Sequence, residues 1–195
     1  MKTKILTLLI VSFTIVSFAQ SQTSEHLTFK GVPIDGTLDE YASKMKQNGF
    51  AHLGKGDGTA LLNGDFAGYK DCIVAVSTLK QKDLVHKIAV IFPNKETWST
   101  LSGNYFDLKQ MLTEKYGKPS DALEKFDADS QPRDNDSKMS EVTFDRCKYY
   151  SIFKTEKGNI ELTIEHDGAA LCYVRLTYFD KINNDIIKEK AKGDL

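Results

Sequence analysis

The chain has 195 residues, of which 41% are hydrophobic, 27% charged and 10% aromatic. This composition is typical of a folded domain and excludes a collagen, a disordered tail and a membrane protein with several spans. The formal net charge is −1 at pH 7 and only three of the 26 basic residues are arginine, so we expect no nucleic-acid partner, because both charge attraction and forked phosphate-binding side chains are scarce.

Residues 1–19 have the layout of an export signal. Lys2 and Lys4 give a positive start, an apolar run follows, and Ala19 is a small residue at a cleavage position. The apolar run of 14 residues is short of the roughly 20 needed to span a bilayer. We therefore expect cleavage after Ala19 and an exported protein, periplasmic or secreted, without a transmembrane anchor. Its 24 basic and 27 acidic residues would give a formal charge of −3.

The sequence of residues 27–92 predicts a strand, a helix and three more strands. Thr37 and Glu40 have the spacing of a capping box, and Gly49 is a helix stop, which predicts a helix over residues 38–48. The predicted strands of this half are 27–34, 60–67, 72–79 and 85–92, with a glycine-rich turn at 54–58.

Residues 93–180 repeat this order. A helix is predicted from an apolar stripe that begins at Trp98, advances by three and four residues, and ends before Gly117. Residues 120–140 are polar and resemble a linker. The remaining predicted elements are strands at 142–153, 159–165 and 171–179 and a short C-terminal helix at 185–192.

Together these elements predict one α+β domain over residues 20–195. The strands come in runs with short turns instead of alternating with helices, which disfavours a parallel sheet. We expect an antiparallel sheet of six to seven strands with two amphipathic helices on one face. The order suggests a tandem duplication of a strand–helix–three-strand unit, with pseudo-repeats at about 27–92 and 93–180.

Four stretches of the sequence carry a resemblance to known proteins. They are FKGVPIDGTLDE (29–40), GDFAGYKDC (64–72), LTEKYGKP (112–119) and DRCKYY (145–150). Together they resemble a group of small exported proteins of Gram-negative bacteria known mainly as uncharacterised, a likeness that implies no activity. In topology alone, the duplicated order is similar to the beta-lactamase-inhibitor-protein-like fold, and no inhibitory residue transfers from it.

Cys147 and His166 are the candidates for a nucleophile and its base. A hairpin turn near residue 156 would place these two positions opposite each other on adjacent strands. Thiol catalysis needs a thiolate, which a neighbouring imidazole favours. The alternative is that Cys147 is a small buried hydrophobic residue, and the sequence offers no third catalytic residue.

The three cysteines permit at most one disulfide in an oxidising compartment. In a simple meander one strand would separate Cys147 from Cys172, about 9–10 Å apart and too far for a bridge. We therefore expect three free thiols, unless the strand order differs or Cys72 pairs across the halves.

The acidic segment around residues 127–136 contains features for and against a calcium site. Asp127, Asp129 and Asp134 supply hard oxygen ligands, but Pro132 stands where an EF-hand loop needs glycine and no glutamate follows at its twelfth position. A solvated acidic loop is the better interpretation, and we expect neither a metal nor a cofactor.

Alternation along the last three strands predicts a row of outward-facing side chains. Ile160, Leu162 and Ile164 would point inward, which leaves the residues between them outside. A sheet face that mixes tyrosine, arginine and carboxylates has the composition of a recognition surface. The predicted binding residues are Arg146, Tyr150, Glu161, Glu165, Tyr173, Arg175 and Phe179.

Three functions remain open at the level of sequence. The favoured one is a non-catalytic binding or assembly module that meets an envelope or extracellular protein, peptide or glycan through this sheet face. The second is a small thiol-dependent hydrolase that uses Cys147 and His166. The third is a structural envelope component without a discrete ligand.

Overall fold

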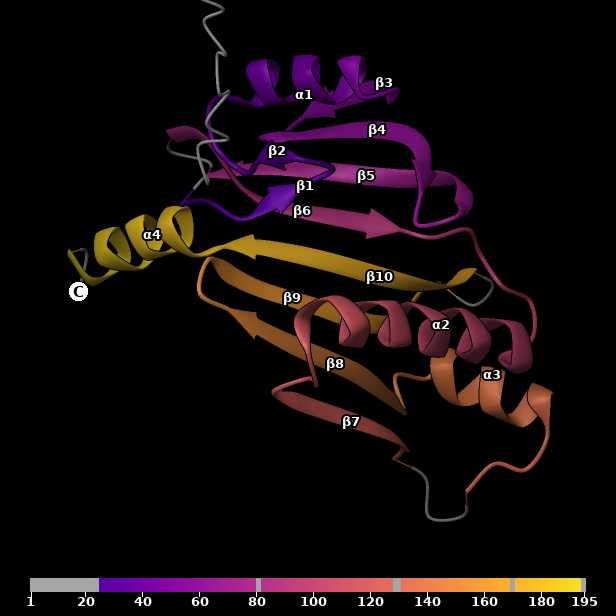
Figure 1. Cartoon of the computed structure of the whole chain (residues 1–195). Coiled ribbons are helices and arrows are strands. Elements are labelled where there is room, and N and C mark those ends of the chain that lie inside the picture. Colours follow the sequence, from indigo (N-terminus) through magenta and orange to yellow (C-terminus); the bar gives the residue numbers. More distant parts are fainter. Residues whose placement is uncertain (1–24, 80–81, 128–130, 169–170, 194–195) are drawn as a thin grey trace, which may run out of the picture.

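A computed structural model describes residues 25–79, 82–127, 131–168 and 171–193. The signal-peptide prediction therefore lies outside the described residues. The described chain is α+β, as expected, with one large antiparallel sheet, a small β-hairpin and four helices (Figure 1). No helix among the described residues combines the length and the apolar character needed to cross a bilayer.

The large sheet has eight strands in the order β3-β4-β5-β6-β10-β9-β8-β7, and every neighbouring pair is antiparallel. The expected six to seven strands were thus too few. The strands are β3 (Ala51–Gly56), β4 (Thr59–Phe66), β5 (Tyr69–Leu79), β6 (Lys82–Ile91), β7 (Asp121–Phe126), β8 (Cys147–Thr155), β9 (Gly158–Asp167) and β10 (Leu171–Asp180).

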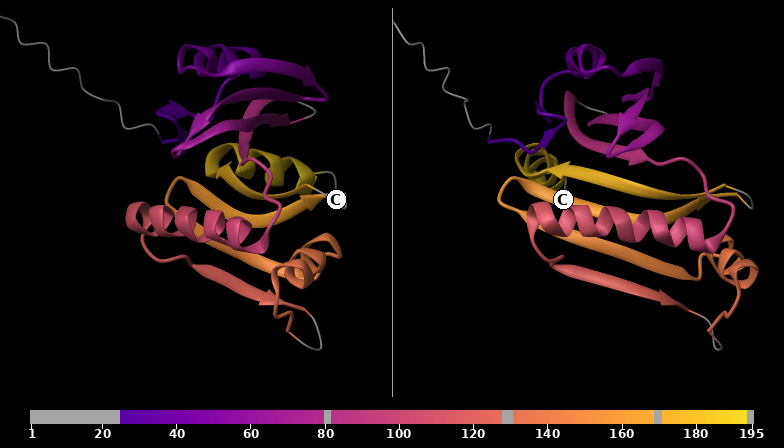
Figure 2. Two further views of the ribbon diagram at one scale, coloured as in Figure 1. Left: turned by 90° about the vertical axis from the view of Figure 1, so that its right-hand side faces the viewer. Right: turned by 45° about the vertical axis from the view of Figure 1, so that its right-hand side comes forward.

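Each half of the sheet is a helix followed by a four-stranded meander. Helix α1 (Leu38–Gln47) precedes β3 to β6, and α2 (Trp98–Tyr116) precedes β7 to β10, with α3 (Asn135–Thr143) inserted between β7 and β8. The last strands of the two halves, β6 and β10, pair with each other in the middle of the sheet. The halves lie side by side along this seam (Figure 2).

Local signals explain where the two main helices begin. Thr37 Oγ1 accepts a hydrogen bond from the Glu40 amide, and the Glu40 carboxylate accepts one from the Thr37 amide, which confirms the predicted capping box. Thr97 caps α2 through the Thr100 amide. Gly103 does not interrupt α2, because the helix continues to Tyr116.

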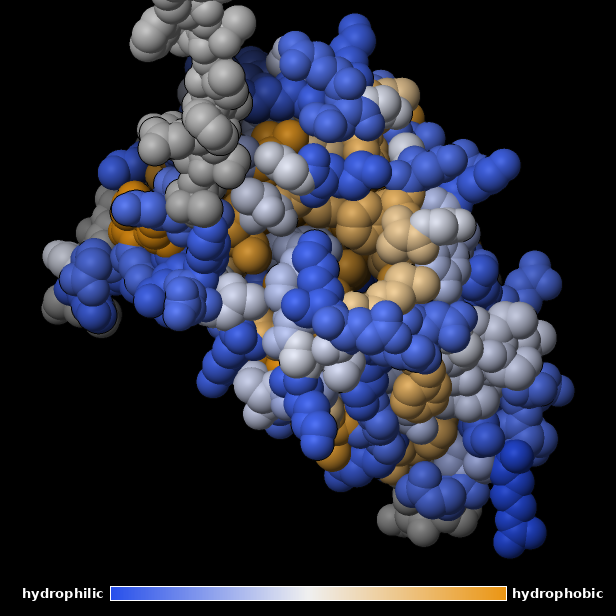
Figure 3. Space-filling model, in the orientation of Figure 1, coloured by the Kyte–Doolittle hydropathy of each residue, from blue (hydrophilic) through white to orange (hydrophobic). Residues whose placement is uncertain are grey.

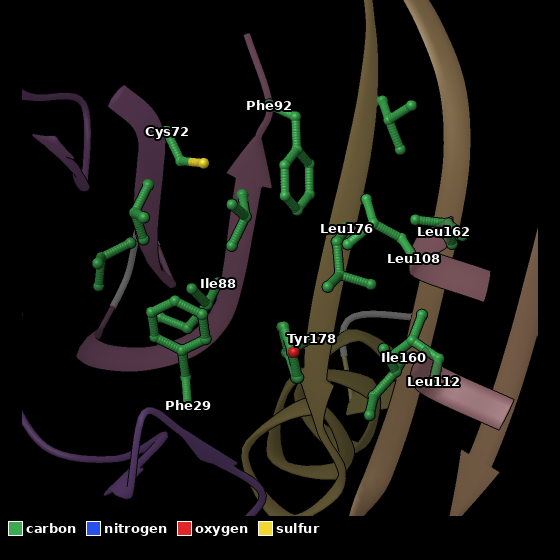
Figure 4. Close-up of a cluster of buried hydrophobic side chains, with 14 of the residues drawn as sticks. Phe29, Cys72, Ile88, Phe92, Leu108, Leu112, Ile160, Leu162, Leu176 and Tyr178 are labelled. Atoms are coloured by element: carbon green, nitrogen blue, oxygen red, sulfur yellow. The ribbon is translucent and has the colours of Figure 1, made fainter. Parts of the chain in front are cut away.

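Helices α1 and α2 cover the same face of the sheet. Their buried side chains join those of the strands in one hydrophobic core. Figure 4 shows Leu108 of α2 pointing toward Leu162 and Leu176, and Leu112 pointing toward Ile160. Phe29, from the small hairpin, stacks on Phe66 with ring centroids 5.0 Å apart and closes the core over the first half.

Three predicted segments differ from the structure. Residues 27–34 form a hairpin of β1 (Thr28–Phe29) and β2 (Val32–Pro33) instead of one strand, because Lys30 and Gly31 adopt positive φ angles in a tight turn. The predicted turn at 54–58 is mostly strand β3, and only Asp57 and Gly58 make the turn. The predicted linker at 120–140 contains β7 and most of α3.

The C-terminal helix is longer than its prediction and starts directly at the end of the central strand. Helix α4 (Lys181–Gly193) follows β10 without a loop and projects from one end of the sheet (Figure 1). Buried Asn183 fixes its first turn, since its side-chain amide donates to the carbonyls of Ile34 and Val85 at 3.0 and 2.8 Å.

Candidate functional site

The face of the sheet opposite α1 and α2 is the candidate site, and we call it the open face. Side chains alternate between the two faces of each strand, so residues that flank the core positions of β10 point to the open face. Of these, Tyr173, Arg175 and Phe179 are half-buried and Thr177 is buried between neighbouring strands, whereas Val174, Leu176 and Tyr178 are buried in the core. Figure 3 looks onto the opposite, helix-bearing side, where hydrophilic residues dominate and apolar ones show between α1 and α2.

The strand register assembles the open face into rows that cross the sheet. One of them, the central row, runs over five adjacent strands through successive Cα partners. Its members are Ile73, Ile91, Arg175, Thr163 and Tyr150. Directly opposite residues on antiparallel strands have Cβ atoms about 5 Å apart, so isoleucine, arginine, threonine and tyrosine form one continuous surface.

A second row lies beside the central row. Its middle is shallow because small residues, Ala75, Ala89 and Thr177, occupy it, and the latter two are buried by their neighbours. Larger residues stand at both ends of this row, namely Leu61, Glu161 and Ile152. The open face is therefore lower in the middle of this row than at its ends.

An ion pair marks the centre of the open face. An Arg175 guanidinium nitrogen lies 2.7 Å from Glu165 Oε1, which also accepts a hydrogen bond of 2.9 Å from the Thr163 hydroxyl. The side chains of Arg175 and Glu165 are 37% and 27% exposed, so both can still reach a ligand. The Nε–H of Arg175 is buried and has no hydrogen-bond partner among the described residues.

Tyr173 extends this charged pair toward the end of the sheet. It stands opposite Glu165 in the β9–β10 register. Burial and the neighbouring Glu165 carboxylate raise the pKa of the Tyr173 phenol, while Arg175 opposes the shift. The Tyr173 hydroxyl is therefore neutral and able to donate a hydrogen bond, next to the Glu165 carboxylate that Arg175 holds.

The structure brings together six of the seven predicted binding residues. Tyr150, Glu161, Glu165, Tyr173, Arg175 and Phe179 all belong to the open face. Arg146 does not join them. It precedes β8, and Glu141 of α3 holds its guanidinium through bonds of 2.6 and 2.9 Å, so it belongs to the corner between α3 and β8.

Sequence reasoning missed the contribution of the first half. Ile73 and Ile91 extend the central row beyond β10, and Ala75 and Ala89 extend the second row. Alternation in 72–79 and 85–92 could have identified them as outward-facing. What the sequence could not reveal is that β6 pairs with β10, which alone makes the two halves one surface.

Cys147 and His166 line the same small pocket of about 180 Å³, together with Asp145 and Glu165. However, His166 is engaged on both ring nitrogens, with Nδ1 2.9 Å from the Gly168 carbonyl and Nε2 3.0 Å from the Asp145 carboxylate. These two acceptors raise the pKa of His166.

The thiol side of the pair is equally unsuited to catalysis. Burial raises the pKa of Cys147 to about 12, with the nearby Cys172 adding to the shift. A base that donates from both nitrogens cannot accept the thiol proton, and a thiol with this pKa is hardly ionised at neutral pH. The pocket therefore has the residues of a thiol enzyme without their activation.

The acidic segment is explained by local structure. Asp134 caps α3 by accepting from the Ser137 amide at 2.8 Å, and Asp127 pairs with Lys125 at 3.0 Å. Asp129 lies outside the described residues. Over the part of the chain that the structure describes, no three His, Cys, Asp or Glu residues are grouped to hold a metal ion.

Comparisons with known proteins give no indication of function, so a proposal has to start from the geometry of the open face. No family model, no curated protein and no solved structure matches the chain.

Proposed function

We propose that this is an exported, non-catalytic binding or assembly module that holds a protein partner of the cell envelope or the extracellular space on its open face. The observation that carries the proposal is the group of side chains at the centre of the open face, the face opposite α1 and α2. There Arg175 of the central row pairs with Glu165, and the half-buried Tyr150 and Tyr173 lie on the same face. Tyrosine and arginine are the residue types that most often anchor protein interfaces.

The size of the open face is compatible with a stable complex. At a spacing of about 4.8 Å between strands and a rise of about 3.3 Å per residue, the eight-stranded sheet presents roughly 34 by 20 Å, or about 700 Å². A specific interface buries about 800 Å² on each partner. The open face therefore supplies most of the area that one such interface needs.

The composition of the open face is also more typical of a protein interface than of a surface that contacts only solvent. Ile73, Ile91 and Ile152 are half-buried on the open face, and Leu61 is 41% exposed. Apolar side chains with a charged pair among them resemble the core and rim of an interface. The shallow middle of the second row would receive a protruding side chain.

The test is a double variant that removes two anchors without touching the core. Tyr173→Ala combined with Arg175→Ala should leave the protein folded, because outward positions of a half-exposed sheet contribute little core burial. The immobilised parent should capture a partner from envelope extract, and the double variant should lose most of that partner. Each buried tyrosine or arginine anchor typically contributes about 2 kcal/mol or more.

A matched control is available at the corner between α3 and β8. Phe144→Ala combined with Arg146→Ala also removes an aromatic residue and an arginine, but both are exposed and lie outside the open face. This control should capture the partner as the parent does. Equal capture by the parent and the Tyr173/Arg175 variant, with both folded, would refute the proposal.

A further inference from the structure

A groove borders the open face where β10 passes into α4. It has a volume of about 520 Å³ and lies between the first turns of α4, the end of β10 and the hairpin that joins β8 to β9. This volume is within the range of about 300–1,000 Å³ found for ligand sites. The groove is therefore large enough to hold several residues of an extended peptide.

The floor of the groove is part of one row of the sheet, in which Phe179, Asn159 and Lys154 line the groove and Lys87 stands next to it. Lys87, Phe179, Asn159 and Lys154 are successive Cα partners on β6, β10, β9 and β8. Because such partners lie on one face, Phe179 and Asn159 stand between two lysines. Phe179 is half-buried and Asn159 is exposed, so the floor offers an apolar ring beside an exposed amide.

Helix α4 adds two more lysines above this floor. Lys181 and Lys188 line the groove, and its single carboxylate is Asp185, which lies 3.9 Å from Lys188. Among the described residues Lys87, Lys154 and Lys181 make no ion pair. With Lys154, the groove is lined by three lysines and one aspartate, which give it a net charge of +2, whereas the whole chain carries −1.

This charge is concentrated where a ligand would enter. A cleft lined by charges of one sign focuses the field and attracts the opposite charge. Beside the groove, burial lowers the pKa of His86, the hydrogen bond with Asn184 opposes this shift, and Lys87 adds to it. His86 is tied to α4 through Asn184 at 3.1 Å.

We infer that this groove binds an acidic segment of the partner protein, with carboxylates on both sides of a large apolar side chain. The apolar side chain would pack on Phe179, the carboxylates would meet Lys154 and Lys188, and the exposed amide of Asn159 would bond the peptide backbone. Lysines bind as point charges, whereas dedicated phosphate sites favour arginine forks, and the groove has none. This inference rests on the proposed function, because the groove opens onto the same face.

A synthetic peptide tests the groove directly. The probe is fluorescein-labelled Glu-Glu-Phe-Glu-Glu, and its binding to the purified protein is followed by fluorescence anisotropy at low salt. We expect binding that weakens at least tenfold in the Lys154→Glu, Lys188→Glu double variant and at least fivefold in Phe179→Ala. The peptides Gln-Gln-Phe-Gln-Gln and Glu-Glu-Ser-Glu-Glu should bind at least tenfold and fivefold more weakly than the probe.

A charge-matched control separates the groove from general attraction. Lys44→Glu with Lys46→Glu makes the same charge change on the exposed side of α1 and should leave affinity within twofold of the parent. Equal losses in both double variants, or no binding of the acidic peptide, would overturn the inference. Heparin binding that exceeds peptide binding and depends on the same lysines would overturn it as well, because the ligand would then be a sulfated glycan.

The same experiment distinguishes the two proposals. The Tyr173→Ala, Arg175→Ala variant should bind the acidic peptide like the parent, because neither residue lines the groove. If that variant loses the captured partner while the peptide never binds, the groove inference fails and the open-face proposal stands. If the peptide binds as expected but the variant keeps the partner, the open-face proposal fails instead.

Discussion

The backbone amide of Leu27 donates a hydrogen bond of 2.8 Å to the carboxylate of Asp180, a residue 153 positions further along the chain. Asp180 is fully buried at the junction of β10 and α4, and its other oxygen accepts from the Asn183 amide at 2.9 Å. His26 lies 3.0 Å from the same oxygen. One carboxylate thus joins the start of the described chain to the last strand and the last helix.

Replacing this carboxylate should destabilise the whole fold. In Asp180→Ala the Leu27 and Asn183 amides lose their acceptor, and each buried unpaired donor costs about 1–3 kcal/mol. We expect a loss of about 2–4 kcal/mol in the free energy of unfolding, measured by urea denaturation. Asp185→Ala, an exposed carboxylate on the same helix, should change it by less than about 0.5 kcal/mol. Similar small effects of both variants would show that the junction contributes little.

Trp98→Ala should reveal the docking of α2. Trp98 is 8% exposed and packs against Phe126 and Tyr149, with ring centroids 4.9 and 5.0 Å away. Removing such a side chain leaves a cavity and typically costs about 3–5 kcal/mol. The measurement is a denaturant melt followed by circular dichroism. Met111→Ala, at a position of α2 that is 47% exposed, is the control and should cost far less, so a small loss in Trp98→Ala would contradict this packing.

The thiols should react slowly in the native state, and all three should react after unfolding. All three cysteines are free in the structure. Burial raises the pKa of Cys72 to about 11 and that of Cys147 to about 12, so only about one Cys147 side chain in ten thousand is a thiolate at pH 8. We expect slow reaction of native protein with Ellman's reagent at pH 8.

Denaturation without a reductant then separates the two interpretations of the cysteines. Three reactive thiols per chain would agree with the structure. One thiol per chain would mean that two cysteines form a disulfide, and it would require a different arrangement of the strands that carry them.

The pair of His166 and Asp145 should stabilise the fold in a pH-dependent way. The folded-state pKa of His166 is raised by the Gly168 carbonyl and by Asp145, above its unfolded value of about 6.5. The stabilisation is therefore fully present below pH 6.5 and is lost as the pH rises through the folded-state pKa. We expect His166→Gln to be less stable than the parent by up to about 1 kcal/mol at pH 5.5, as for an exposed pair.

At pH 8.5 the difference between His166→Gln and the parent should shrink. Asp145→Asn is the matched variant, because Asp145 has a φ angle of 58° and asparagine tolerates this conformation. It should show the same pH dependence by removing the other partner. A stability difference that stays constant between pH 5.5 and 8.5 would contradict the ion pair.

Local patterns in the sequence determined the elements that have strong local causes. The capping box at Thr37, the apolar stripe from Trp98 and the alternation of β10 predicted α1, α2 and the outward-facing residues, because each pattern depends on neighbours within a few positions. Predictions were wrong for segments whose local sequence signals are weak or mixed. The polar residues 120–140 hide β7 and most of α3, whose stability comes from pairing with β8 and packing on α2.

Only the tertiary structure decided which residues lie together in the candidate site. Arg175 and Ile91 are 84 positions apart, and they become neighbours because β6 pairs with β10. In the same way, Lys154 and Lys188 line one groove only because β8, β9, β10 and α4 meet there. Pairing of distant strands depends on the packing of the whole core and on the loop entropy that it offsets. The sequence pattern of a single segment gives no information about core packing or loop entropy, so it could not predict this pairing.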